Sequence, residues 1–108
     1  MATTSFRQVQ AYLDHLLVSW REKHHRRADV RDAHGDGGMR WRTREQLLSA
    51  RPFGVELVAP NTPGRETNLY LALTRGIPAF PRMPLGGPYL PEDQCEYIAT
   101  WIDEGMPE

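Results

Sequence analysis

The segment from Gly76 to Pro91 constrains the fold most, because it holds five prolines and three glycines. Proline has no backbone N–H to donate, and it is excluded from the interior of helices and of central strands. We therefore expect this segment to be an ordered but irregular loop that lies over the rest of the protein. The regular elements must come from the chain on either side of it.

Four other segments have helical patterns. The N-terminal segment, residues 1–26, has apolar residues at steps of three and four from about residue 4, which predicts an amphipathic helix with one buried stripe: Phe6, Val9, Leu13, Leu16, Leu17 and Trp20. At Thr43 a capping box begins a second helix, in which Thr43 Oγ1 accepts from the backbone N–H of Gln46 and the Gln46 side chain reaches back. Residues 66–75 predict a third helix and residues 91–104 a fourth, whose predicted buried face is Cys95, Ile98, Trp101 and Ile102. The sequence thus predicts one all-α domain over residues 1–108, with about four helices and long Pro/Gly-rich connecting loops.

Charge and composition exclude several classes of partner. The formal net charge is −1, so we expect no nucleic-acid partner, and the basic run from Arg21 to Arg27 is interpreted as a solvated helix end rather than an anion-binding patch. No apolar stretch approaches the roughly 20 residues of a membrane helix. The first residues lack the basic and apolar regions of a signal peptide, and the one cysteine, Cys95, cannot form an internal disulfide. We therefore expect a cytoplasmic protein with no membrane partner and a buried, inert thiol.

Catalytic and metal-binding signatures are weak. The sequence has no nucleophile elbow, no phosphate-binding loop with lysine and no His-Glu-x-x-His motif, so we do not expect independent enzyme activity. His24, His25 and His34 are weak candidates for a metal site, with carboxylates from Asp29, Asp32 or Asp36. Adjacent side chains on a helix point apart, so His24 and His25 do not easily bind one ion. Exposed histidines at a charged helix end are the favoured interpretation.

Six short motifs occur in an order that resembles the class I cytochromes c. They are Gly37-Gly38-Met39-Arg40, Thr43-Arg44-Glu45-Gln46-Leu47-Leu48, Pro63-Gly64, Leu69-Tyr70, Arg82-Met83-Pro84-Leu85-Gly86-Gly87-Pro88-Tyr89-Leu90 and Trp101-Ile102-Asp103-Glu104-Gly105. From about Trp20 to Pro107, the chain is similar to the planctomycete-type cytochrome c family. The resemblance implies a cytochrome c-like fold, in which residues 28–42 are a degenerate haem-attachment loop and residues 76–91 are the Met-Pro loop.

The chain departs from this family where haem would be attached. The family has Cys-x-x-Cys-His, whereas this chain has Val30-Arg31-Asp32-Ala33-His34. A thioether link needs a thiol, so Val30 and Ala33 exclude covalent haem at this position. His34 and Met83 remain where the resemblance places the two axial ligands, and such a pair suits an electron carrier.

Two functions remain open. The favoured one is a haem-free protein-interaction or accessory module for a partner enzyme or redox protein. An empty haem cavity would cost about 24 cal/mol per Å³, so aromatic side chains are expected to fill it; the candidates are Trp41, Phe53, Tyr70, Phe80 and Tyr89. The predicted contact surface is the loop from Gly76 to Leu90 together with the edge around His34. Its contact residues in the loop are Phe80, Arg82, Met83 and Tyr89. The alternative is an electron carrier that binds haem non-covalently through His34 and Met83, and a homodimer through the stripe of the first helix stays open.

Overall fold

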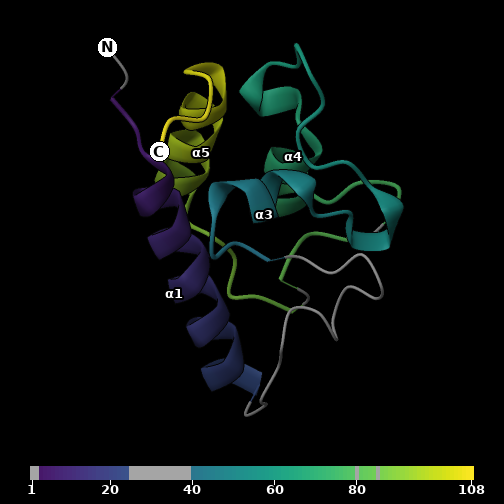
Figure 1. Ribbon diagram of the computed structural model, residues 1–108. Coiled ribbons are helices and arrows are strands. Elements are labelled where there is room, and N and C mark those ends of the chain that lie inside the picture. Colours follow the sequence, from purple (N-terminus) through teal and green to yellow (C-terminus); the bar gives the residue numbers. More distant parts are fainter. Residues whose placement is uncertain (1–2, 25–39, 80, 85) are drawn as a thin grey trace.

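The computed structural model describes residues 3–24, 40–79, 81–84 and 86–108 (Figure 1). Over these ranges it contains α-helices and short 3-10 turns but no β-strand, which confirms the predicted all-α class. The elements are α1 (Phe6–His24), α3 (Arg44–Ser49), η2 (Pro52–Gly54), η3 (Gly64–Glu66), α4 (Asn68–Thr74) and α5 (Glu92–Asp103). Most of the predicted haem-attachment loop, including Val30, Ala33 and His34, lies outside the described residues.

Helix α1 follows its predicted stripe, most closely in its N-terminal half. Phe6, Val9 and Leu13 are buried in the core, and Leu16 packs against it from the next turn. Leu17 and Trp20, further along the same stripe, are half-buried. The C-terminal half of α1 extends beyond α3, α4 and α5 (Figure 1). The residues of α1 that bury most apolar surface are therefore those next to the other helices.

Helix α5 is the centre of the packing, because it contacts α1, α4 and η3. Its four predicted core residues, Cys95, Ile98, Trp101 and Ile102, are all buried, which confirms the predicted face. Two aromatic pairs join α5 to α1: the ring centroids of Phe6 and Trp101 lie 6.1 Å apart, and those of Tyr12 and Tyr97 lie 5.4 Å apart and perpendicular. Such pairs add specific geometry to the area that they bury.

The segment before α1 is fastened to the end of α5. The Glu104 carboxylate accepts hydrogen bonds from the backbone N–H and hydroxyl groups of Thr3 and Thr4, at 2.6–3.0 Å. These bonds, led by the one from the Thr4 hydroxyl, lower the pKa of Glu104 to about 2. The carbonyl of Pro107 accepts from Phe6 N and from Trp101 Nε1, both at 2.8 Å. Thr3 and Thr4, before α1, therefore lie next to the residues that follow α5.

The capping box of α3 is present, with one difference from its predicted form. Thr43 Oγ1 accepts from the backbone N–H of Gln46 at 3.1 Å, as expected. The Gln46 side chain does reach back, but its Oε1 accepts from the backbone N–H of Arg42, one residue before the cap, at 3.1 Å. The side chains of Thr43 and Gln46 thus each accept a hydrogen bond from a backbone N–H group at the start of α3.

Helix α4 begins two residues later than predicted because Thr67 caps it. Thr67 is buried; its hydroxyl accepts from Tyr70 N at 3.3 Å and donates to Gly64 O at 2.7 Å. The preceding turn, η3, contains Gly64, where a Cβ atom would lie 2.1 Å from the carbonyl oxygen of Ala99 in α5. Only glycine allows the two backbones to approach so closely here. The Pro63-Gly64 motif therefore sets the packing distance between η3 and α5.

Candidate functional site

The Met-Pro loop is the best-supported candidate site, and its described parts contain no helix or strand, as predicted. Two consecutive residues of the loop are bonded to α4. Met83 N donates to Ala72 O at 2.8 Å, and Arg82 Nε donates to Leu73 O at 3.2 Å. Met83 and Arg82 are both half-buried. Helix α4 therefore fixes the position of two of the four loop residues that were predicted from the sequence to contact a partner.

The C-terminal end of α1 holds the other part of the loop. Lys23 Nζ donates to Gly86 O at 2.7 Å, and His24 Nε2 lies 2.9 Å from Gly87 O. The His24 ring also packs on Trp20, with 4.8 Å between the ring centroids. A Cβ atom on Gly86 would lie 2.8 Å from His24 Cε1, so glycine lets the helix end and the loop meet. This contact was not predicted from the sequence, where its only signal was the basic run interpreted as solvated.

The half-buried Arg82 and the exposed Tyr89 form a pair on this loop. The Arg82 guanidinium carbon lies 4.1 Å from the centroid of the Tyr89 ring, which is a cation–π contact. Tyr89 is 43% exposed and does not belong to the buried core. Tyr89 is thus a surface residue, and the Arg82 guanidinium covers one face of its ring. Phe80, the other aromatic residue predicted for this surface, lies outside the described residues.

Two of the predicted pocket-filling residues pack against the core. Trp41 and Tyr70 are half-buried and contact the buried cluster. Trp41 Nε1 donates to Asp14 Oδ1 at 2.7 Å, which joins the segment before α3 to α1. The Tyr70 hydroxyl donates to Glu96, and this bond is the main reason that the pKa of Tyr70 is raised and that of Glu96 is lowered. Phe53 is another predicted pocket-filling residue, and the structure does not describe its side chain.

Cys95 is a buried thiol, as predicted. It is 1% exposed, and its Sγ lies 3.6 Å from the carbonyl oxygen of Leu90. Burial raises the pKa of the Cys95 thiol, which keeps it protonated and unreactive at neutral pH.

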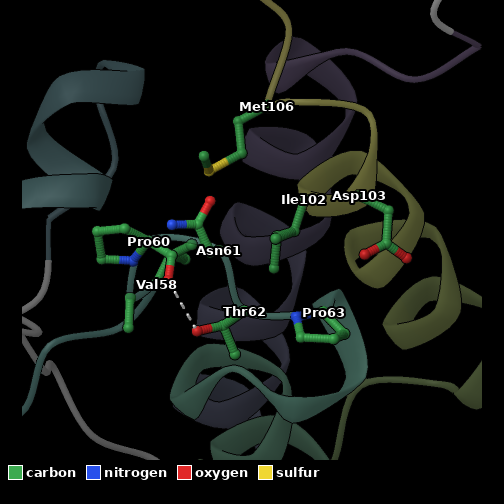
Figure 2. A pocket seen from close by; sticks show the side chains of 9 residues that line it. Val58, Pro60, Asn61, Thr62, Pro63, Ile102, Asp103 and Met106 are labelled. Carbon is green, nitrogen blue, oxygen red and sulfur yellow. Dashed lines mark hydrogen bonds between the residues drawn. The ribbon is translucent and has the colours of Figure 1, made fainter.

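A surface pocket of about 520 Å³ lies at the other end of α5. It is lined by Val58, Ala59, Pro60, Asn61, Thr62, Pro63, Ile102, Asp103 and Met106, and Asn61 and Met106 face one another across it (Figure 2). The Asp103 carboxylate accepts from Gly64 N at 2.7 Å, and the Thr62 hydroxyl is bonded to Pro60 O. Its polar side chains thus bond mainly to the surrounding backbone, so the pocket offers no acid–base pair for catalysis.

Neither a metal centre nor a membrane span is found in the described part of the chain. No three His, Cys, Asp or Glu side chains come together there. Of the three histidines predicted as weak metal ligands, His25 and His34 lie outside the described residues, whereas His24 contacts the Met-Pro loop. None of the helices within the described ranges has the length and apolar character that a membrane crossing requires.

Comparison of the chain with protein-family models, with curated proteins and with solved structures finds no match.

Proposed function

We propose that this protein is a haem-free interaction or accessory module with a cytochrome c-like fold, which binds a partner enzyme or redox protein through the Met-Pro loop. The sequence supports the haem-free part, because Val30 and Ala33 occupy the positions of the two thioether cysteines. The packing of Trp41 and Tyr70 against the core supports the idea that aromatic side chains occupy space that a cofactor would otherwise take.

The observation that carries the proposal is the cation–π contact between the half-buried Arg82 and the exposed Tyr89. Arginine and tyrosine are enriched among the residues that contribute most to protein–protein binding. Bonds to α4 and α1 hold the loop at Arg82, Met83 and Gly86, so little conformational entropy would be lost there when a partner binds. An exposed aromatic ring on a rigid support is suited to contact a partner.

The second candidate function is non-covalent haem binding by His34 and Met83. An imidazole and a thioether are suitable donors for haem iron in an electron carrier. The hydrogen bond from Met83 N to Ala72 O favours this function, because it fixes the backbone that carries the thioether. When bound, the haem would supply one-electron transfer, and these two side chains would hold its iron.

A crosslinking experiment tests the interaction function. Tyr89 is replaced by p-benzoylphenylalanine, and the variant is irradiated in cells that express it. Val18 on α1, which is 47% exposed, is the matched control position. We expect position 89 to give a discrete adduct of defined mass and position 18 to give none. The same adducts from both positions, or no discrete adduct from position 89, would contradict the proposal.

An absorbance spectrum distinguishes the two functions. The protein is purified from haem-supplemented cells and then titrated with haemin. The proposal predicts no Soret band and no saturable binding. A sharp Soret band at one haem per chain, lost in His34→Ala/Met83→Ala and kept in the control Met106→Ala, would instead establish a non-covalent haem protein.

A further inference from the structure

The guanidinium group of Arg82 is held in one orientation before any ligand arrives. Its Nε donates to Leu73 O at 3.2 Å, and the Tyr89 ring covers one face of the group at 4.1 Å. Arg82 itself is half-buried, whereas Tyr89 is 43% exposed. A guanidinium fixed along one edge and one face loses little freedom when it forms further hydrogen bonds.

The opposite edge of this group has no carboxylate partner within the described residues. The ion pairs found there are Arg44–Glu45, Arg51–Glu56 and Arg65–Glu96, and none includes Arg82. Glu92 and Asp93, in the first turn of α5, are exposed and form no ion pair with Arg82. The terminal nitrogens of Arg82 likewise donate to no acceptor in the described ranges. Among the described residues, Arg82 is therefore a half-buried cation with no carboxylate partner.

The chemistry that would complete an ion pair with Arg82 is a carboxylate. The terminal nitrogens of a guanidinium match the two oxygens of a carboxylate and bind them with parallel hydrogen bonds. Lys23 adds a second cation to the same loop through its bond to Gly86 O. The exposed part of the Tyr89 ring supplies apolar surface next to the charge. The ligand that fits is therefore a carboxylate with an apolar neighbour.

We infer that Arg82 and Tyr89 form a recognition site for an acidic side chain of the partner protein, an Asp or Glu next to an apolar residue. The inference rests on the proposed interaction function and adds to it the chemistry of the partner segment. Arg82 provides the two donors, and Tyr89 holds the guanidinium and contacts the apolar neighbour.

The test uses two blocked peptides, acetyl-Ala-Phe-Glu-Phe-Ala-amide and its Gln counterpart. The full-length protein, labelled with nitrogen-15, is titrated with each peptide while the Nε–Hε signal of Arg82 is followed by NMR. We expect saturable shifts of this signal with the Glu peptide and about tenfold weaker binding of the Gln peptide, since a hydrogen bond to a charged group is lost. Arg82→Lys keeps the charge but not the planar donor edge and should also lose about tenfold. The exposed Arg75→Lys is the matched control and should bind as wild type.

Several results would overturn the inference. They are equal binding of the two peptides, no saturation by either peptide, unchanged affinity in Arg82→Lys, or an equal loss in Arg75→Lys. Each variant is compared with wild type by circular dichroism, so that a folding defect is recognised. Haemin also carries carboxylates, so it is titrated against wild type, Arg82→Lys and His34→Ala/Met83→Ala in parallel. Saturable haemin binding that persists in Arg82→Lys and is lost in His34→Ala/Met83→Ala would refute the haem-free function. Haemin binding that is lost in Arg82→Lys would be binding of the propionates by the carboxylate site, and failure of the peptide arms alone would refute only that site.

Discussion

Replacing Gly64 by Ala adds one methyl group where η3 meets α5. The new Cβ would lie 2.1 Å from the Ala99 carbonyl oxygen and 2.8 Å from Ala99 C and Cα. All three are backbone atoms, so no side-chain rotation relieves the contact. The two backbones must separate by roughly 1 Å to restore an ordinary contact distance. That separation also strains the 2.7 Å hydrogen bond from Gly64 N to Asp103 Oδ1.

The expected loss of stability follows from these two effects. Overpacking a well-packed contact costs about 1–3 kcal/mol, and a weakened hydrogen bond to a carboxylate adds up to about 1.5–3 kcal/mol. The lower entropy of the unfolded Ala chain offsets about 0.4–1 kcal/mol of this. We therefore expect the free energy of unfolding to fall by about 3 kcal/mol, which lowers the Tm by roughly 10–20 °C in a domain of this size.

Urea unfolding, followed by tryptophan fluorescence, measures this change. Gly54→Ala is the control: Gly54 has φ 77°, and a Cβ atom there would have no other atom within 4 Å, so only the backbone penalty of about 1 kcal/mol applies. The double variant Gly64→Ala/Ala99→Gly should be no more stable than Gly64→Ala, because the contacted atoms remain. A loss in Gly64→Ala no larger than that in Gly54→Ala, or a rescue by Ala99→Gly, would refute the reasoning.

Two further predictions concern titratable groups. The pKa of Glu104 is about 2 in the folded protein against 4.5 ordinarily, so its stabilising effect is complete above pH 4.5 and disappears as the pH falls towards 2. The Tm values of wild type and Glu104→Gln should therefore differ at pH 7 and converge between pH 4.5 and 2. A difference in Tm that does not change with pH would contradict the role of Glu104. Burial and a raised pKa make the Cys95 thiol unreactive. A thiol-specific disulfide reagent should therefore react with the native protein at least about a hundredfold more slowly than with the protein unfolded in guanidinium chloride. Comparable rates would show that the core around Cys95 opens readily.

Local patterns in the sequence were sufficient to predict much of the fold. Apolar spacing identified the buried residues Phe6, Val9 and Leu13 of α1, and Thr43 marked the start of α3. The proline content of residues 76–91 excluded regular structure in the Met-Pro loop, in agreement with its described parts. These predictions succeed because helix periodicity, capping and proline geometry depend on neighbours in the chain.

The contacts that the sequence did not reveal all join distant segments. Nothing near Glu104 in the sequence indicates that Thr3 and Thr4 bond to it, and nothing near Gly64 indicates Ala99 as its neighbour. In the candidate site, Arg82 was predicted as a contact residue, but its position over Tyr89 was not. Such pairs depend on how the helices pack, which one sequence does not encode in any local period. The cytochrome c-like assignment and the role of His34 remain predictions.

Thermal unfolding with and without haemin tests the haem-free account most directly. We predict that the chain without haem unfolds in one cooperative transition, followed by far-ultraviolet circular dichroism, and that one equivalent of haemin leaves the Tm unchanged. A specific ligand at about 100 times its Kd would add about 2.7 kcal/mol, which corresponds to a rise in Tm of roughly 10 °C or more. A rise of that size that is lost in His34→Ala/Met83→Ala, or a transition that occurs only when haemin is present, would contradict the account.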